Sequence, residues 1–513
     1  MINRSLFVAV ATTLSALSAL AAQPKVEGTP WNQFRGPGGS GVAESCSPPV
    51  TIDSAKATWD IAIPPGHSSP VLAGELIVVT AVDGDKLVTL AFNKKTGQPA
   101  WRKEAPQSPI EKVHRTGSPA ASTPCADDER IYVYFGSYGL ICYDLQGGER
   151  WKKPIPTPSS MYGMSTSPIL HGDQVILVLD NDANVQGSKL SASKIIALNK
   201  TNGELVWETH RPFHRSGWST PTIWKHKEGV ELVVLGNGRL CGYDAATGNE
   251  KWFVNGFSRE TIAVPIVGDG RIFASASMLG GMADDQPDPL PFWDAVMRFD
   301  ANKDGKLTRE EMTEHFAYPL RPDLPVTHPG FGLPLPSDAV QRSKRLDGVF
   351  AATDKNKDGF WTKEEFLSSI SFNRGKPNLI SVRPGGQGDV TESHIAWSLH
   401  RGIPEIPCPI YHRDRIHLVR DGGVLRTIDA ESGKIIYESR LGAGGHYRAS
   451  PVIANDHLYM ISEEGVVSVV KTGDEFTLMH QHALKDSVAA TPAIDASTIY
   501  IRTKARLFAF RNE

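Results

Sequence analysis

The chain has 513 residues, a formal net charge of −3 and an ordinary content of apolar residues. This length exceeds one ordinary domain and allows one large β architecture with a small insertion. No polybasic run is present and the charge balance is slightly acidic, which argues against nucleic acid as the main partner.

Residues 1–21 are typical of a secretory signal peptide. Arg4 supplies the positive charge, Leu6 to Leu20 form a short apolar stretch, and Ala19-Leu20-Ala21 fits the cleavage site. The stretch is short for a membrane span, although a retained signal anchor is the alternative, and no other stretch is long enough to cross a bilayer. No cysteine directly follows the cleavage site, so a lipid anchor is not expected. We therefore predict a periplasmic or secreted protein whose mature chain lacks a membrane span.

The cysteines do not suggest a cofactor site. They are few for an exported protein, their odd number cannot pair completely, and no two have the spacing of a metal or haem motif. We expect most of them to be buried apolar residues. They are Cys46, Cys125, Cys142, Cys241 and Cys408.

One pattern recurs along the chain from Trp59 onward. A small or polar residue precedes a proline, and then come an apolar strand, a polar turn and a second strand. An Asp/Asn-x-x-Thr/Ser-Gly turn follows, with an aromatic residue about four positions later. The proline positions are Pro70, Pro124, Pro168, Pro221, Pro265, Pro409, Pro451 and Pro492, the turns begin at Asn93, Asp144, Asn199, Asp244 and Asp429, and the aromatic residues are Trp101, Trp151, Trp207, Trp252 and Tyr437.

This period of about 40–55 residues predicts the blades of a β-propeller, each with four strands. The tryptophan is expected to pack between neighbouring blades, where it buries a large apolar area. The last repeat, Thr491 to Phe510, has no Gly-Trp ending, and Trp59 has no repeat before it. We therefore expect a strand around Ala57–Ile63 to complete the last blade and remove two open sheet edges. Eight proline positions then predict eight blades.

The repeat resembles the PQQ-like β-propeller family over residues 31–282 and 376–513, and Trp31-Asn32-Gln33-Phe34-Arg35-Gly36-Pro37 is similar to the start of exported members. The resemblance implies one of two functions. Quinoprotein alcohol dehydrogenases hold pyrroloquinoline quinone (PQQ) with calcium over the channel, whereas the propeller of the outer-membrane assembly machinery binds partner proteins without a cofactor. The repeat residues build blades rather than a site, so they indicate the fold and not the function.

Two acidic loops lie in the widest gap of the repeat, at residues 300–311 and 354–365. Both loops resemble the twelve-residue calcium-binding loop of an EF-hand and match it at every ligand position. Calcium prefers six to eight oxygen ligands, and a glycine at the sixth position allows the sharp turn. The expected ligands are Asp300, Asn302, Asp304, Lys306 (backbone carbonyl), Thr308 and Glu311, and then Asp354, Asn356, Asp358, Phe360 (backbone carbonyl), Thr362 and Glu365.

Apolar residues with helical spacing flank both loops and should pack the two hands together. They are Phe292, Val296, Phe299, Met312 and Phe316 around the first loop, and Leu346, Val349, Phe350, Phe366 and Ile370 around the second.

The EF-hand pair is predicted to replace one loop of the fifth blade. Strand two of this blade is expected at residues 271–275 and strand three at residues 378–382. The fold class is thus an all-β, eight-bladed β-propeller closed by the N-terminal strand, with a small α-helical EF-hand pair inserted in blade five. The predicted boundaries are a signal peptide at 1–21, an extension at 22–56, propeller at 57–282, the insertion at 283–375 and propeller at 376–513.

The segments before each proline should ring one mouth of the central channel, on the same face as the insertion. They are rich in basic residues and histidine, which suggests an anionic or polar ligand or an acidic peptide. A solvated rim without a ligand is the alternative, and no short-spaced pair of histidines supports a metal there. The candidate ligand-binding residues are His67, Arg115, His214, Arg215, Arg259, His446 and Arg448, with His114, Tyr162, Glu260 and Glu405 in the same segments. A second acidic stretch, Asp180 to Asn184, lacks the glycine and final glutamate of a calcium loop and is interpreted as a polar loop.

The first functional hypothesis is an exported calcium-binding propeller scaffold that also binds a partner protein or a polar ligand at the channel mouth. The alternative is a PQQ-dependent dehydrogenase that oxidises alcohols or sugars. No two cysteines are adjacent, although such a pair contacts the quinone in the known alcohol dehydrogenases. No hydrolase signature singles out a nucleophile or an acid–base pair either. The balance favours a binding protein over an enzyme, and no catalytic residue is predicted.

Overall fold

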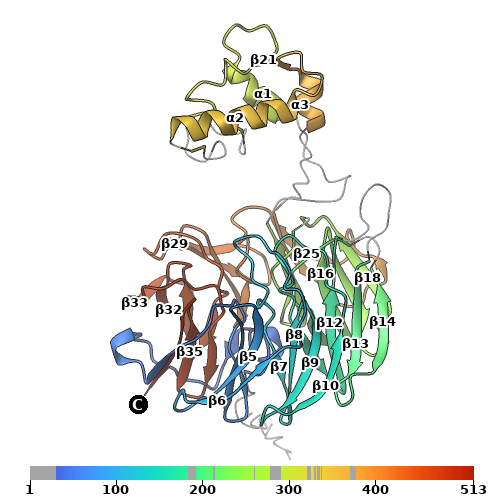
Figure 1. Ribbon diagram of the computed structural model, residues 1–513, viewed down its shortest axis with the longest axis vertical. Helices are drawn as coiled ribbons and strands as arrows, with labels where there is room; N and C mark the ends of the chain where they lie inside the picture. The colour runs from blue at the N-terminus through green and yellow to red at the C-terminus, as the bar shows by residue number, and fades with distance from the viewer. Residues whose placement is uncertain are drawn as a thin grey trace, which may run out of the picture.

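The computed structural model describes residues 31–182, 192–211, 214–258, 260–277, 290–319, 325–327, 331, 335–336, 338–369 and 377–512. Eight antiparallel sheets of four principal strands form an eight-bladed β-propeller, which confirms the predicted fold. Figure 1 shows the propeller from the side, with a small helical unit standing apart from it.

The first four blades use consecutive strands. Blade one contains β3 (Val71–Ala73), β4 (Leu76–Asp83), β5 (Lys86–Asn93) and β6 (Pro99–Glu104); blade two β7 (Cys125–Ala126), β8 (Arg130–Phe135), β9 (Gly139–Asp144) and β10 (Glu149–Pro154); blade three β11 (Ile169–His171), β12 (Gln174–Leu179), β13 (Lys194–Asn199) and β14 (Leu205–His210); blade four β15 (Thr222–His226), β16 (Gly229–Gly236), β17 (Arg239–Asp244) and β18 (Glu250–Asn255).

The other four blades carry the exceptions. Blade five contains β19 (Ile266–Gly268), β20 (Arg271–Ala276), β23 (Asn378–Val382) and β25 (Ile395–Leu399); blade six β26 (Ile410–His412), β27 (Arg415–Arg420), β28 (Val424–Asp429) and β29 (Ile435–Arg440); blade seven β30 (Val452–Ala454), β31 (His457–Ile461), β32 (Val466–Lys471) and β33 (Thr477–Ala483); blade eight β34 (Ala493–Asp495), β35 (Thr498–Arg502), β36 (Arg506–Arg511) and β2 (Trp59–Ala62). Two short parallel strands, β1 (Val42–Ala43) and β24 (Gly388–Asp389), extend blades seven and four.

The N-terminal strand closes the ring, as predicted. Strand β2 pairs antiparallel with β36, so that Trp59 lies opposite Ala509. The insertion also lies where it is predicted, because β20 and β23 pair directly although about a hundred residues separate them. The helical unit therefore replaces the connection between the second and third strands of blade five.

A ring of hydrogen bonds joins the blades around the channel. In seven of the eight blades the residue before the repeat proline donates its backbone N–H to the side chain of the equivalent residue in the next blade. Seven such bonds of 2.9–3.2 Å are present, the one from Val264 ending on the Cys408 sulfur. Val264 has no hydroxyl, so the link from blade four to blade five lacks this bond. The ring consists of Ser69, Thr123, Ser167, Thr220, Val264, Cys408, Ser450 and Thr491.

Tryptophans of the outer strands pack on the turn of the next blade, also as predicted. A Cβ atom on Gly147 would lie 2.9 Å from the Trp101 ring, and one on Gly203 would lie 2.7 Å from the Trp151 ring. Both glycines have positive φ angles, of 80° and 74°, so the position requires glycine for two independent reasons. Trp59 packs on Gly97 in the same way and thereby joins blade eight to blade one.

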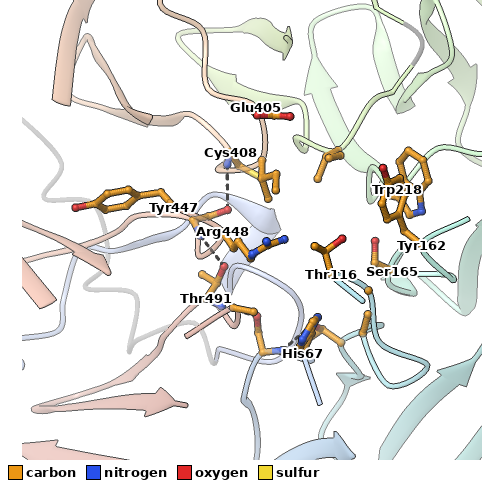
Figure 2. Close-up of a pocket in the computed structure, with 18 of the residues that line it drawn as sticks. His67, Thr116, Tyr162, Ser165, Trp218, Glu405, Cys408, Tyr447, Arg448 and Thr491 are labelled. Atoms are coloured by element: carbon orange, nitrogen blue, oxygen red, sulfur yellow. Dashed lines mark hydrogen bonds between the residues drawn. The ribbon is translucent and has the colours of Figure 1, made fainter. Parts of the chain in front are cut away.

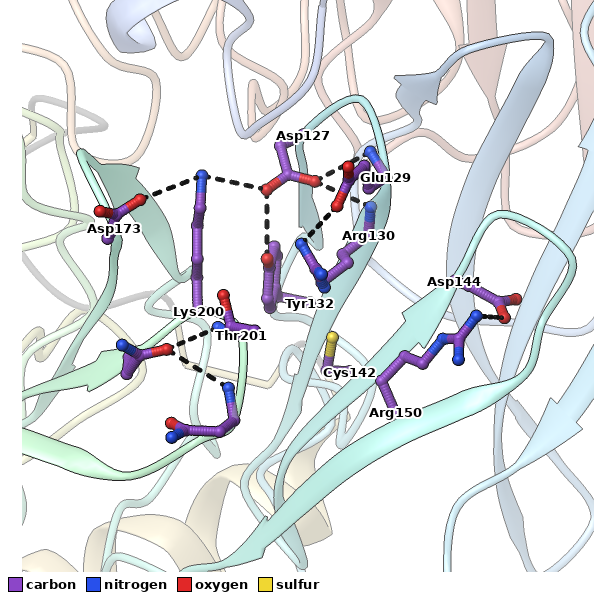
Figure 3. A network of polar contacts seen from close by, with 12 residues as sticks. Asp127, Glu129, Arg130, Tyr132, Cys142, Asp144, Arg150, Asp173, Lys200 and Thr201 are labelled. Atoms are coloured by element: carbon purple, nitrogen blue, oxygen red, sulfur yellow. Dashed lines mark hydrogen bonds and ion pairs between the residues drawn. The ribbon is translucent and has the colours of Figure 1, made fainter.

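The turns add polar contacts between blades, shown for blades two and three in Figure 3. The Trp151 indole donates to the Lys200 carbonyl over 3.0 Å. The Lys200 ammonium lies 3.5 Å from Asp127 of blade two and 3.7 Å from Asp173 of its own blade. Lys200, a single turn residue of blade three, thus contacts both a tryptophan and a carboxylate of blade two.

The segment from Trp31 to Ala43 crosses the end of the channel opposite the mouth. It includes η1 (Pro37–Gly39), and its Trp31 and Arg35 side chains are fully buried. Asn32 exchanges hydrogen bonds with Ala126 of blade two, and Arg35 donates to the Pro409 carbonyl between blades five and six. Because this segment also pairs with blade seven, it connects distant parts of the ring and covers the floor of the channel. The chain then passes η2 (Ser54–Lys56) and enters β2.

The helical unit has its own core. It contains α1 (Leu290–Val296), η4 (Met297–Phe299), α2 (Ala339–Thr353) and α3 (Lys363–Ser369), and the antiparallel strands β21 (Leu307–Thr308) and β22 (Phe360–Trp361). All the flanking apolar residues predicted to join the two hands lie in one cluster, except Ile370, which is outside the described residues. Among the described residues, no helix is long and apolar enough to cross a membrane.

One flank of the first loop differs from the helical spacing read in the sequence. Met312 and Phe316 are buried, but residues 309–318 form turns rather than a helix. Fewer than ten residues separate the loop from Pro319, and proline disfavours helix in the residue before it. Packing against the shared core therefore holds this segment without regular secondary structure.

We predict that Ser450→Ala weakens the propeller. The substitution leaves the buried N–H of Cys408 without its acceptor, which should lower the free energy of unfolding by about 1–3 kcal/mol. Urea unfolding measures this change, with Thr201→Ala on an exposed turn as the matched control. Equal stability of the two variants would contradict the structural role of the ring.

Candidate functional site

The two acidic loops have nearly the same backbone. Lys303 and Lys357 both have a φ of 61°, and Gly305 and Gly359 have φ angles of 83° and 86°. Strands β21 and β22 pair the loops side by side, with Leu307 opposite Trp361. This short sheet joins the eighth and ninth positions of the first loop to the eighth and seventh positions of the second.

Each loop folds around its own carboxylates. The two oxygens of Asp300 accept hydrogen bonds from the Lys303 and Gly305 amides, over 2.7 Å and 3.0 Å. Glu311 accepts from the amide and hydroxyl of Thr308 on one oxygen and from Ala301 on the other. The second loop repeats these contacts, with Asp354 bound to Gly359 and Glu365 bound to Thr362.

These contacts favour charged carboxylates. Burial opposes the charge of Glu311, but the hydrogen bonds from Thr308 outweigh it and lower the pKa of this carboxyl. The Thr362 hydroxyl likewise lowers the pKa of Glu365. Among the described residues, no three His, Cys, Asp or Glu side chains gather as they would around a metal ion. The donor set suits calcium in kind, since all its atoms are oxygens, and the ligand roles stay predictions.

A cavity of about 390 Å³ opens at the channel mouth (Figure 2). Its floor contains six members of the hydrogen-bonded ring, together with Phe34 of the N-terminal segment. Its walls come from the segments that precede the repeat prolines and, in blade six, from the connection between β27 and β28. The volume lies within the usual range for small-molecule sites.

The cavity brings together only part of the predicted site. His67, His446 and Arg448 line it, as do His114, Tyr162, Glu260 and Glu405 from the same segments. Arg115 is exposed outside the cavity. Arg259 lies outside the described residues.

Two other candidates lie behind the wall. His214 is buried, and its ring is so close to Gly236 that a Cβ there would lie 2.4 Å from Nδ1. Burial is the main cause that lowers the pKa of His214 far below its usual value. The Arg215 Nε lies 3.4 Å from Asp182. Neither residue lines the cavity.

The stretch predicted to be a polar loop begins with a buried ion pair. Both oxygens of Asp180 accept from the Arg211 guanidinium, over 2.8 Å and 2.9 Å, and both side chains are almost fully buried. Residues 183–191 lie outside the described part of the chain. The start of this stretch is therefore buried and paired inside blade three rather than part of a polar surface.

The sequence missed two important lining residues, Trp218 and Asp421. Trp218 lies two residues before Thr220 of the ring, so proximity to the proline position would have indicated it. Asp421 lies in the connection between β27 and β28, which approaches the same mouth. It accepts a hydrogen bond from the Tyr447 amide and lies 2.6 Å from Nδ1 of His446.

Charges interact across the cavity. Burial lowers the pKa of His67 to about 4, and the positive charges of Arg502 and Arg448 add to this effect. The pKa of Glu405 is raised, first by partial burial and then by the charge of Asp421, although His446 and Arg448 oppose the shift. Asp421 raises the pKa of His446 through their hydrogen bond and opposite charge.

The residues present do not fit pyrroloquinoline quinone. This cofactor is a planar tricarboxylate and requires several cations, whereas the described lining residues of the cavity supply three carboxylates and a single guanidinium. Cys408 is the one cysteine among its described lining residues, so no vicinal pair faces the cavity. Neither the charge nor the sulfur chemistry supports the dehydrogenase alternative.

We predict that His67 makes the protein less stable in acid. Its pKa is near 6.5 when unfolded and about 4 when folded, so protonation favours unfolding as the pH falls through this range. Between pH 7 and pH 5, the free energy of unfolding of His67→Gln should fall by about 2 kcal/mol less than that of the wild type. Urea unfolding at both pH values measures the difference, with His315→Gln in the helical unit as an exposed control. Parallel pH profiles for His67→Gln and the wild type would contradict the prediction.

Comparison with known proteins agrees with the fold. The family described as outer membrane protein assembly factor BamB matches residues 49–187 and 191–306, and an EF-hand family matches residues 297–317. A comparison with curated protein sequences finds no match.

Among solved structures, BamB from Moraxella catarrhalis is 12% identical with a TM-score of 0.51, covering 89% of this chain and 97% of its own. The designed protein Ika8 is 10% identical with a TM-score of 0.50, covering 88% of this chain and 98% of its own. Quinohemoprotein alcohol dehydrogenase ADHIIG from Pseudomonas putida HK5 is 11% identical with a TM-score of 0.50, covering 94% and 80%. The chain therefore has the fold of an eight-bladed β-propeller whose repeats resemble the PQQ-like family, with an EF-hand match in the insertion of its fifth blade.

Proposed function

We propose that the protein is an exported binding scaffold whose EF-hand pair holds two calcium ions beside a ligand-binding channel mouth. The observation that carries the proposal is the pairing of two complete EF-hand loops, through β21 and β22, in a unit inserted on the face of the mouth. The propeller supplies a rigid ring, and its connections supply the contacting side chains.

Topology supports the placement of the unit on this face. Asp421 lies between the second and third strands of blade six and lines the cavity. The insertion occupies the equivalent connection of blade five, between β20 and β23. Since strands alternate in direction within every blade, both connections leave the propeller on the same side.

Calcium would stabilise the arrangement of the two EF-hand loops, which regular secondary structure supports only in part. The segment after the first loop is not helical, and the two hands share one core. Six oxygen donors in each loop could fix this arrangement, and calcium is plentiful outside the cytoplasm. We therefore infer a permanently loaded structural module rather than a fast sensor.

The mouth is proposed to bind a polar ligand or a segment of a partner protein. The matching family is described as an outer membrane assembly factor, which supports binding rather than catalysis and a location outside the cytoplasm. The domain boundaries predicted from the sequence, including the signal peptide at 1–21 and the insertion at 283–375, form part of this proposal.

We predict that calcium stabilises the helical unit. Ligand that binds only the folded state raises its stability, by about 3 kcal/mol at a hundredfold excess over Kd. Thermal unfolding with calcium and then with a chelator should show a shift in the transition of the helical unit, and metal analysis should find two calcium ions per chain. No shift together with no bound calcium would disprove the proposal.

A matched pair of double variants tests the ligands themselves. Glu311→Gln with Glu365→Gln should abolish the calcium-dependent shift, because glutamine cannot bind calcium through two carboxylate oxygens. Glu310→Gln with Glu364→Gln changes the neighbouring exposed glutamates by the same chemistry and should preserve the shift. Equal responses of the two double variants would contradict the assigned ligands.

A further inference from the structure

The wall of the mouth cavity divides into three chemically different sectors, because each blade supplies its own connection. Blades two to four contribute an aromatic sector. The Tyr162 ring meets the His114 and Trp218 rings edge to face, with centroids 5.4 Å and 5.2 Å away. Trp218 is 7% exposed and its indole donates to the Gly163 carbonyl, so this sector is fixed in place. Figure 2 shows Tyr162 and Trp218 together on one side of the cavity.

Blades five and six contribute an acidic sector. Glu260 and Glu405 precede the first strands of these blades, and Asp421 follows the second strand of blade six. The charges of Glu260 and Glu405 both contribute to raising the pKa of Tyr162, after the larger effect of burial. Both carboxylates line the same cavity as Tyr162 and Trp218.

Blades seven, eight and one contribute a basic sector. The Arg448 guanidinium points to the middle of the cavity in Figure 2, and its Nε lies 2.8 Å from Glu463. Arg502 of β35 is buried behind His67, where it donates to Ser68 and to the Pro64 carbonyl. In the described part of the chain Arg502 forms no ion pair with a carboxylate, and its charge acts on His67 from behind.

We propose that the cavity binds a small zwitterion with an apolar or planar part, namely a free amino acid or a short peptide with both termini charged. The carboxylate would meet Arg448, the ammonium group would meet Glu405 and Glu260, and the apolar part would lie on Tyr162 and Trp218. This inference deepens the proposed function, on which it rests, by naming the ligand class of the mouth.

The arrangement disfavours ligands with one sign of charge. A pure anion of suitable size would approach the carboxylates of blades five and six, and a pure cation would approach Arg448 and Arg502. Either contact leaves one set of cavity charges opposed to the ligand, which costs affinity in a partly enclosed site. A zwitterion satisfies both sectors at once.

Four related probes separate these alternatives by isothermal titration calorimetry. L-Phenylalanine carries both charges, N-acetyl-phenylalanine only the carboxylate, phenylalaninamide only the ammonium, and N-acetyl-phenylalaninamide neither. Phenylalanine should bind about tenfold or more tightly than each of the three blocked forms. The dipeptide Phe-Phe then decides whether the site prefers a free amino acid or a short peptide.

Two variants test which sector of the cavity binds each charged group of the ligand. Arg448→Gln should weaken phenylalanine about tenfold but leave phenylalaninamide unchanged, since this probe has no carboxylate. Glu405→Gln should weaken phenylalanine but leave N-acetyl-phenylalanine unchanged. Arg383→Gln and Glu392→Gln, both exposed on blade five away from the cavity, are the matched controls.

The inference is overturned if no probe binds, or if a blocked form binds as tightly as phenylalanine. Equal binding of N-acetyl-phenylalaninamide would instead indicate an internal segment of a partner protein. The same samples, melted with calcium and with chelator, keep the two proposals apart. An intact calcium response without phenylalanine binding disproves only the ligand class, whereas loss of the calcium response disproves the scaffold proposal.

Discussion

The bond between a backbone N–H and a side chain of the next blade is the constraint on which the propeller depends. It recurs immediately before the first strand of seven of the eight blades, at the residue that precedes the proline, and these positions surround the channel. Proline removes its own N–H and fixes φ, so the preceding residue is extended and its N–H is directed along the ring. The ring thus links neighbouring blades around the channel, and six of its residues line the cavity.

This geometry explains why the mouth is built from residues distant in sequence. Each blade delivers to the mouth the segment before its first strand and the connection between its second and third strands, and only a few residues of each can reach the cavity. Tyr162, Trp218 and Arg448 arise from three such connections. The amino-acid composition of these connections can therefore differ from blade to blade without altering the fold. This allows aromatic, acidic and basic sectors to line one cavity. The same freedom allows blade five to carry an entire helical unit in place of one connection.

The repeat predicted the propeller, its closure by β2 and the position of the insertion, because these follow from strand periodicity and from turn chemistry. The lining of the cavity was harder to predict. His214 lies in the correct connection yet is buried behind Gly236, whereas Trp218, four residues later, faces the cavity. The direction of a side chain depends on the path of its loop, which the repeat does not specify. Helical spacing likewise places Met312 and Phe316 in the core without making their segment a helix, since a nearby proline shortens the available stretch.

The N-terminal segment gives the propeller an unusual order of assembly. Arg35 bonds to a carbonyl 374 residues away, and Trp59 pairs with Ala509 in the last strand. Arg35, β1 and β2 thus find their partners only after the later blades have formed, whereas Asn32 bonds to blade two. Such contacts of high sequence separation slow folding and leave strand edges exposed until the chain is complete. A chain released before blade eight would have neither a closed ring nor a partner for β2. The propeller can therefore close only after blade eight has been synthesised.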